Sequence, residues 1–372
     1  MKIHFIGIGG IGLSALARFL VHQGHIVSGS DMKESPITLE LIKEGINVTY
    51  PQKASNIKSP DIVIYSAAVT DENPELIESR IHQIRTLSRK EALPLIMNDT
   101  KNYCVAGAHG KSTTTAILSS ILNCSALIGA ISKDFGSNFR YVGNTVAFEA
   151  DESDASFILS NPYCSIVTNA EPEHMEYYHY DYEKFYDAYK QFVNLGKVAI
   201  LNAEDEHIKK LNIKNAINLY PSVDIKNLSY TLKDKEPCTR FDLKDLGTFE
   251  VWGFGYHIAV DASLAIIAAL NELDVESIRT NLLKYKGIKK RFDVVQANDK
   301  IVVIDDYAHN PTEIEVTMKS VELYDNLTNL DNRIVLWQPH KYSRTSDNLE
   351  GFKKCFRRCD ELIILPIWTI PG

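Results

Sequence analysis

Lys111 lies in the segment whose residue types point most directly to chemistry. An apolar run, residues 103–106, leads into Gly107-Ala108-His109-Gly110-Lys111-Ser112-Thr113, and an apolar helical pattern follows. In such a loop the backbone N–H groups surround a phosphate, the lysine spans the β- and γ-phosphates, and the Ser112 hydroxyl suits Mg²⁺. Val105 stands where the general pattern has its first glycine. The segment predicts one nucleoside triphosphate site on an exposed loop, where loss of Lys111 is expected to cost little stability.

A second glycine-rich turn, Gly7-Ile8-Gly9-Gly10-Ile11-Gly12, follows the strand-like run 2–6. Glycine lets the backbone approach a diphosphate, and the N-terminus of the following helix offers free N–H groups. Asp31 ends the next strand-like run, where its carboxylate is placed to take a ribose hydroxyl. The pattern predicts nucleotide binding but does not distinguish a dinucleotide from a nucleotide-diphosphate sugar.

Acidic side chains gather in a third segment, Glu149-Ala150-Asp151-Glu152-Ser153-Asp154, at the end of the strand-like run 145–149. Ligands of α/β proteins bind at the carboxyl ends of parallel strands, and carboxylate oxygens suit Mg²⁺. A solvated acidic loop explains the same residues equally well. His174 follows another strand end in the same region and is a second candidate, although a lone histidine is more often structural.

The elements that must position these residues alternate between strand-like and helical patterns, which predicts βαβ units and parallel sheets. The alternation restarts after residue 100 and after Arg291, so we predict three α/β domains over 1–100, 101–288 and 289–372. The first and third are expected to be Rossmann-like, and the central one to be a P-loop ATPase-like domain with a parallel or mixed sheet. The main expected strands are 2–6, 25–28, 61–66, 103–106, 145–149, 164–168, 197–201, 300–304, 333–337 and 361–365.

The composition excludes several classes of protein. The 372 residues include 40 Lys+Arg and 48 Asp+Glu, and a net charge of -8 argues against a protein that mainly coats nucleic acid or anionic lipid. No stretch of 18 residues is free of charged or polar interruption, so no membrane insertion is expected. The 6 cysteines form no CxxC pair. They predict buried, reduced thiols in a cytoplasmic protein.

Taken together, the motifs resemble the Mur ligase family of peptidoglycan synthesis. The phosphate loop is similar to the family's Gly-Thr-His-Gly-Lys-Thr, with Ala108 and Ser112 in place of the two threonines. The acidic stretch 149–157 resembles that of the alanine-adding members. Three later segments also match family motifs: Lys290-Arg291-Phe292, residues 305–313, and residues 338–345. The resemblance spans the whole chain.

By motif position, the resemblance assigns roles to residues in all three predicted domains. The implied catalytic residues are Lys111, Glu149, His174, Arg291 and Asp306, and the implied Mg²⁺ ligands are Ser112, Glu149 and His174. The implied ATP contacts are Gly107, Ala108, His109, Gly110, Lys111, Ser112, Thr113, Asp261 and Arg291. The implied UDP-sugar contacts are Gly9, Gly10, Ile11, Gly12, Asp31 and Ser66. The implied amino-acid site contains His340, Lys341 and Arg344.

The activity that the resemblance implies is ATP-dependent joining of L-alanine to UDP-N-acetylmuramate through an acyl phosphate. The sequence departs from the family in three places. Asp261 stands where an asparagine is usual, Lys341 replaces an arginine, and the sequence stops at Gly372, where family members normally continue. The third domain is therefore expected to be incomplete and the ligation of alanine to be weak.

Other functions explain part of the same pattern. A ligase that attaches a whole tripeptide in recycling would use the same residues and differ only in its amine pocket. A nicotinamide-dependent dehydrogenase would explain the N-terminal turn but leave Lys111 without a role. A non-catalytic nucleotide switch would explain Lys111 but not the N-terminal turn, and loss of activity through truncation is a further alternative. The sequence leaves the oligomeric state open.

Overall fold

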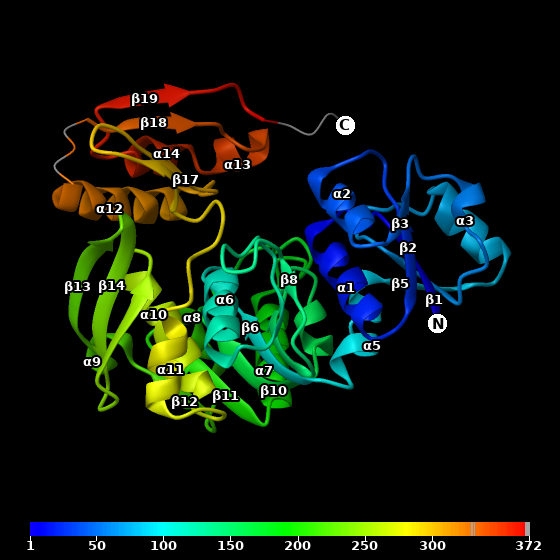
Figure 1. Cartoon of the computed structure of the whole chain (residues 1–372), viewed down its shortest axis with the longest axis horizontal. Coiled ribbons are helices and arrows are strands. Elements are labelled where there is room, and N and C mark those ends of the chain that lie inside the picture. Colours follow the sequence, from blue (N-terminus) through cyan, green and yellow to red (C-terminus); the bar gives the residue numbers. More distant parts are fainter. Residues whose placement is uncertain (329, 331, 369–372) are drawn as a thin grey trace.

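The N-terminal region is built on a parallel sheet of five strands in the order β3-β2-β1-β4-β5. The computed structural model describes residues 1–328, 330 and 332–368 (Figure 1). The strands are β1 (Lys2–Ile6), β2 (Ile26–Ser30), β3 (Asn47–Thr49), β4 (Ile62–Tyr65) and β5 (Arg85–Ser88). The helices are α1 (Ile11–His22), α2 (Pro36–Lys43), α3 (Pro74–Ile81), α4 (Arg89–Ala92) and α5 (Pro94–Met97), with a 3₁₀ turn η1 (Ala54–Asn56).

The central region contains a mixed sheet of seven strands in the order β12-β11-β10-β6-β9-β7-β8. Its strands are β6 (Lys101–Ala106), β7 (Ser125–Leu127), β8 (Phe139–Arg140), β9 (Thr145–Glu149), β10 (Pro162–Val167), β11 (Val198–Asn202) and β12 (Ile217–Leu219). Its helices are α6 (Lys111–Leu122), α7 (Tyr182–Leu195), α8 (Glu206–Leu211), α9 (Pro221–Asp224), α10 (Tyr256–Ala269) and α11 (Val275–Leu282), with a 3₁₀ turn η2 (Ser156–Leu159).

Strand β6 is buried on both faces, as its continuous apolar sequence predicts. Tyr103 and Val105 pack in the cluster that includes α6 and α10, whereas Cys104 and Ala106 pack in the cluster that includes α7. Because successive side chains of a strand point to opposite faces, both layers of helices are anchored on this strand. The loop that follows β6 is thereby held in a rigid frame.

An antiparallel sheet that the sequence analysis missed adjoins the central region. It consists of β13 (Ile225–Lys233), β14 (Glu236–Leu243) and β15 (Thr248–Trp252), in that order. β13 is largely exposed and mostly polar. The βαβ pattern is recognised by continuous apolar runs, so a half-exposed antiparallel strand escapes it.

The C-terminal region forms two small sheets within the described residues, one antiparallel (β16–β17) and one parallel (β18–β19). The strands are β16 (Asp293–Ala297), β17 (Val302–Asp305), β18 (Ile334–Trp337) and β19 (Glu361–Ile364). The helices are α12 (Pro311–Thr328), α13 (Tyr342–Asp347) and α14 (Leu349–Cys355). Figure 1 shows α12 between the β13–β14 sheet and the β18–β19 sheet. β16 was not predicted, and Gly372 lies outside the described residues.

The predicted α/β fold class is confirmed, with both parallel and mixed sheets. The exact domain bounds at 100 and 288 stay a prediction. All six cysteines are free, and five of them are buried. Among the described residues, no helix is long and apolar enough to cross a membrane.

The N-terminal and central regions share a buried polar contact. Arg18 of α1 has a side chain that is only 3% exposed, and its Nη1 donates to Asn138 Oδ1 at 2.8 Å. Asn138 Nδ2 donates in turn to the Ile11 carbonyl at 2.5 Å, and Arg18 Nε donates to Glu44 at 2.7 Å. The first turn of α1 is therefore fixed against the central region.

Candidate active site

The phosphate loop lies between β6 and α6, as predicted. Gly107 has φ 142° and Gly110 has φ 80°, so both adopt a backbone that favours glycine. Thr168 Oγ1 and Asn169 Nδ2, at the end of β10, donate to the His109 carbonyl at 2.5 and 2.8 Å. The loop shape is thus imposed by a neighbouring strand as well as by its own glycines.

Lys111 does not extend into solvent, and the expectation of an exposed side chain is wrong. Its side chain is 16% exposed, and Nζ donates to the carbonyls of Gly107 and Ala108 and to Glu152 Oε1, the last at 3.0 Å. Burial acts to lower the pKa of Lys111, but the nearby Glu152 and Glu149 carboxylates outweigh it and raise that pKa. The ammonium is therefore held within the loop.

Glu152 is the carboxylate that pairs with Lys111, a contact that the sequence analysis did not predict. Its side chain is 2% exposed, and its Oε2 is buried without a hydrogen-bond partner among the described residues. Burial raises the pKa of Glu152, against the opposing effect of Lys111. A buried carboxylate oxygen without a partner is costly unless a cation or donor joins it.

The acidic stretch begins at the end of β9, next to β6 in the sheet, so it converges with the phosphate loop. Glu149 Oε2 accepts from the Gly129 N–H at 2.7 Å, and a Cβ on Gly129 would lie 2.7 Å from Glu149 Oε1. His174 is exposed with φ 52°, and its ring makes no hydrogen bond or ion pair with the described residues. No group of three or more His, Cys, Asp or Glu residues in the described part of the chain is arranged to hold a metal. The ligand set Ser112, Glu149 and His174 stays a prediction.

Glu313, at the start of α12, brings the C-terminal region to the phosphate loop. Its Oε1 lies 3.8 Å from His109 Nδ1 and 3.8 Å from Arg291 Nη1. Its Oε2 lies 3.3 Å from His309 Nδ1. His109 Nε2 is also 3.3 Å from Glu171 Oε2. Arg291 therefore reaches the loop through Glu313, and no described contact joins Arg291 to the loop directly.

Two aspartates among the predicted site residues lie close to backbone. Asp306 accepts from the N–H groups of Phe292 and Ala308, each at 2.7 Å, and burial raises its pKa. Asp261 is 6% exposed, and a Cβ on Gly110 would lie 2.5 Å from its Oδ1. Burial raises the pKa of Asp261 to about 8. The Asp261 carboxyl group thus lies against the phosphate loop. Its contact with adenine stays a prediction.

The N-terminal glycine turn is held by two of its predicted site residues. Asp31 Oδ2 accepts from the Gly9 N–H at 2.8 Å, and its Oδ1 accepts from the Met32 N–H at 2.7 Å. Gly7 has φ 79°, and a Cβ there would lie 3.1 Å from Ser66 Cβ. Asp31 thus braces the turn, and its contact with a ribose stays a prediction.

Gly10 precedes α1 as its N-cap, and Ile11 begins the helix. A Cβ on Gly12 would lie 2.6 Å from Arg89 Nη1, so the Arg89 guanidinium rests directly on this turn. Arg89 Nη2 donates to Asp151 Oδ2 at 3.1 Å. Arg89 was not among the predicted site residues, because nothing in its local sequence indicates this contact.

The predicted amino-acid site residues lie together in the C-terminal region. The His340 ring stacks on Trp368 with centroids 4.7 Å apart, and Arg344 Nη1 lies 3.4 Å from His340 Nδ1. Lys341 is exposed with φ 69°. Burial and the positive charges of Arg344 and Lys341 lower the pKa of His340.

Sequence profiles of known families match all three regions. The profile of the Mur ligase family catalytic domain matches residues 2–101, and that of the Mur ligase middle domain matches 105–269. The profile of the Mur ligase glutamate ligase domain matches 290–367. The UDP-N-acetylmuramate–L-alanine ligase of Campylobacter curvus is 56% identical over 369 residues, which are 99% of this chain and 85% of the relative.

The chain belongs to the Mur ligase family.

Other family members support the same grouping. The UDP-N-acetylmuramate–L-alanine ligase of Helicobacter pylori is 51% identical over 99% of this chain and 82% of its own length. The crystal structure of the UDP-N-acetylmuramate–alanine ligase of Thermotoga maritima matches with a TM-score of 0.85 and 27% identity, over 99% of this chain and 86% of that one. A murein peptide ligase of Psychrobacter arcticus matches in fold alone, with 22% identity and a TM-score of 0.71 over 98% of this chain and 84% of that one.

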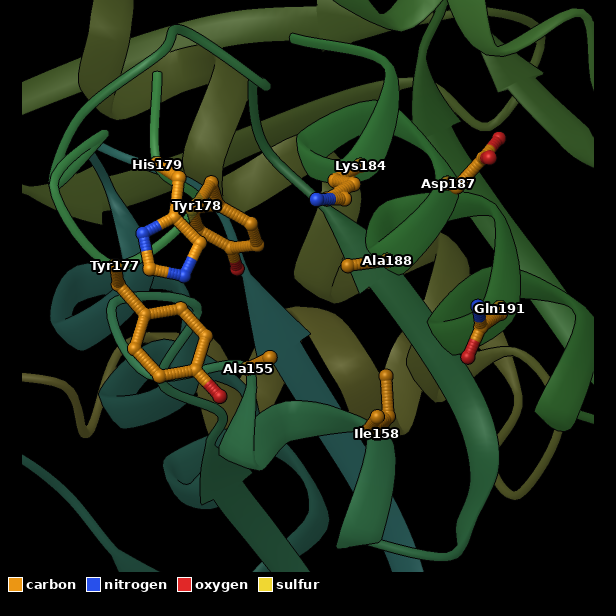
Figure 2. A pocket seen from close by; sticks show the side chains of 9 residues that line it. All are labelled: Ala155, Ile158, Tyr177, Tyr178, His179, Lys184, Asp187, Ala188 and Gln191. Atoms are coloured by element: carbon orange, nitrogen blue, oxygen red, sulfur yellow. The ribbon is translucent and has the colours of Figure 1, made fainter. Parts of the chain in front are cut away.

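In this Mur ligase an open cavity lies beside the acidic stretch. Its volume is about 480 Å³. Figure 2 shows Tyr177 and His179 on one side and Ala188 and Gln191 on the other. None of the residues that line it is a predicted site residue. The cavity is therefore separate from the predicted site residues.

Proposed function

We propose that this Mur ligase joins L-alanine to the carboxylate of UDP-N-acetylmuramate and consumes ATP. The observation that carries the proposal is the convergence of the phosphate loop and the acidic stretch at one end of a sheet, with the N-terminal glycine turn linked to them through Arg89. The identity of 50 to 56% to ligases of that name supports it. The six free cysteines and the use of ATP support a cytoplasmic location.

The chemical problem is that a carboxylate is a poor electrophile at neutral pH. In the first step a carboxylate oxygen attacks the γ-phosphorus of ATP, the bond to the β-phosphate oxygen breaks, and an acyl phosphate and ADP form. In the second step the amine of alanine attacks the acyl carbon, phosphate leaves, and the nitrogen loses a proton. Lys111 would exchange its loop carbonyls and Glu152 for phosphate oxygens and neutralise the developing charge.

Water has to be excluded while the acyl phosphate exists, because water would hydrolyse it. The C-terminal region reaches the phosphate loop through Glu313 and His109. We propose that this region covers the reacting groups and that His340, Lys341 and Arg344 bind the carboxylate of alanine. Asp306 would position Arg291 by fixing the backbone of Phe292 next to it.

The residues at the loop fit a bound Mg²⁺. Ser112, which follows β6, and Glu149, which ends the parallel neighbour β9, offer hard oxygen donors at the same end of the sheet. Ser112, Glu149 and His174 would hold the ion. When bound, Mg²⁺ would neutralise charge on the phosphoryl oxygens.

Phosphate release from ATP tests the proposed function. The assay contains UDP-N-acetylmuramate and compares L-alanine, L-serine, glycine and a tripeptide as the amine. We expect the highest kcat/KM with L-alanine. Release that requires the tripeptide, or that is independent of UDP-N-acetylmuramate, would contradict the proposal.

The Mg²⁺ assignment predicts different effects for two neighbouring carboxylates. Glu149→Ala should raise the Mg²⁺ concentration for half-maximal rate by about tenfold or more, because a ligand is lost. Glu152→Ala should lower kcat at every Mg²⁺ concentration, since it removes the partner of Lys111. Equal shifts in Mg²⁺ dependence would show that the ligand assignment is wrong.

A further inference from the structure

Arg89 stands between the two nucleotide sites proposed above. It is the first residue of α4, whose start is fixed by a reciprocal pair of hydrogen bonds between Ser88 and Glu91. Its Nη1 lies against Gly12, because a Cβ on Gly12 would be only 2.6 Å from this atom. Its Nη2 lies 3.1 Å from Asp151 Oδ2 and 3.5 Å from Ser156 Oγ. One guanidinium thus touches the glycine turn and the acidic stretch.

The electrostatic environment of Gly12 favours an anion. Helix α1 begins at this turn with no side-chain cap and no acidic residue in its first turn; the nearby Asp31 carboxylate accepts from the Gly9 N–H, which precedes the helix. Arg89 adds a positive charge at the same place. Within the described part of the chain, Arg89 Nε and Nη1 donate no hydrogen bond, because both donor contacts of the guanidinium use Nη2. Free donors of a planar guanidinium match a phosphate or a carboxylate.

The other side of Arg89 leads to the phosphate loop. Burial acts to raise the pKa of Asp151, but hydrogen bonds from Ser153 and the charges of Arg89 and Lys111 outweigh it and lower that pKa. Asp151 therefore lies in the field of both cations. The next residue, Glu152, holds the Lys111 ammonium at 3.0 Å. Asp151, the partner of Arg89, thus directly precedes Glu152, the partner of Lys111.

We infer that Arg89 is a positioning residue that couples the two sites: Nη1 binds an anionic group of the UDP-sugar, and once that group is bound Nη2 positions Asp151 so that ATP binds more tightly. The inference rests on the proposed function, because it takes a UDP-sugar as the occupant of the glycine turn. Two anions of that ligand fit the guanidinium, the diphosphate and the lactyl carboxylate. Such coupling is reciprocal, so each nucleotide raises the affinity for the other by the same factor.

Isothermal titration calorimetry measures this factor directly on the full chain. A non-hydrolysable ATP analogue with Mg²⁺ is titrated alone and with saturating UDP-N-acetylmuramate. For the unaltered chain we expect about tenfold tighter binding of the analogue in the presence of the sugar nucleotide. Arg89→Gln should bind the analogue alone as before and should lose most of the tenfold factor. Asp151→Asn should lose the factor while it keeps its affinity for UDP-N-acetylmuramate.

Lys90→Gln is the matched control. Lys90 is the next residue of the same helix and also reaches the central region, where Nζ donates to the Asp154 carbonyl at 2.9 Å and to Tyr177 OH at 2.8 Å. It does not contact Gly12. We expect Lys90→Gln to keep the coupling, and Arg89→Lys to bind the sugar nucleotide without full coupling, since a compact ammonium lacks the planar fork of donors with which the guanidinium faces Gly12 and Asp151 at once.

UDP-N-acetylglucosamine identifies the anion, because it has the diphosphate and lacks the lactyl carboxylate. Coupling by this compound assigns Nη1 to the diphosphate, and coupling by UDP-N-acetylmuramate alone assigns it to the carboxylate. Retained coupling in Arg89→Gln, equal loss in Lys90→Gln, or no coupling in the unaltered chain would overturn the inference and leave the proposed function standing. Failure of the unaltered chain to bind UDP-N-acetylmuramate would instead overturn the proposed function.

Discussion

At the scale of single residues, the Lys111–Glu152 pair links stability to catalysis. Lys111→Ala should lower the rate of phosphate release by at least about 100-fold, because a positive charge at the phosphoryl group is lost. It should also lower the free energy of unfolding by about 3 kcal/mol, because Glu152 is left buried without its partner. The double variant Lys111→Ala/Glu152→Gln should recover most of the stability and none of the activity. Urea unfolding measures the stability and phosphate release measures the activity. An unchanged stability in Lys111→Ala would contradict a buried Lys111–Glu152 pair and favour an exposed lysine.

Asp261 gives the free energy of unfolding a dependence on pH. Its pKa is about 8 in the folded chain against 3.8 for a free side chain, so the folded state holds a proton that the unfolded state releases between these values. Stability should therefore fall as pH rises from about 4 to about 8, by up to ~1.4 kcal/mol per pH unit. Asp261→Asn should lack this contribution and be the more stable form at pH 8. Parallel stability curves for the two chains between pH 5 and pH 8 would contradict this reading of the buried carboxyl group.

At the scale of elements, the β1–turn–α1 unit separates the sugar-nucleotide and dehydrogenase hypotheses. A Cβ on Gly9 would lie 2.8 Å from both Asp31 Oδ2 and Thr38 Cγ2, so any side chain displaces the carboxylate that braces the turn. Gly9→Val should abolish binding of UDP-N-acetylmuramate and leave binding of an ATP analogue alone unchanged, because the phosphate loop lies on another sheet. The unaltered chain should not bind NADH. Calorimetric titrations of the three ligands decide the point, and tight NADH binding would favour a dehydrogenase.

At the scale of the whole molecule, an aromatic cluster joins the C-terminal region to the central one. Phe254 and Phe292 pack with Tyr324 of α12, whose hydroxyl donates to the Lys235 carbonyl at 2.7 Å. Tyr324→Ala should cost about 3 to 5 kcal/mol at this contact and split thermal unfolding into two transitions. Tyr342→Ala, in the same region but 67% exposed, should melt as the unaltered chain does. A single cooperative transition in Tyr324→Ala, seen by differential scanning calorimetry, would show that the regions do not depend on this cluster.

The sequence by itself determined the local units of this protein. Strand β6, the loop Gly107–Gly110 and helix α6 lie where they were predicted, because an apolar run, glycines with positive φ and a helical pattern are all local signals. The α/β class and the family followed from the same signals and from motifs within short windows. The β13–β15 sheet was missed, since the polar, largely exposed β13 and the mixed polar and apolar sequences of β14 and β15 lack the apolar continuity that marks a central parallel strand.

Only the tertiary structure decided which distant side chains meet. Glu152 neutralises Lys111 because β9 lies beside β6 in the sheet, an order that no local pattern encodes. Arg89 reaches Gly12 and Asp151 because α4 packs where the N-terminal and central regions join. Burial then determined the charge states. It raised the pKa of Asp261, which lies against the phosphate loop, whereas the sequence had predicted only an acceptor for adenine. The physical reason is that burial and pairing depend on packing between elements, whereas the sequence specifies directly only the elements themselves.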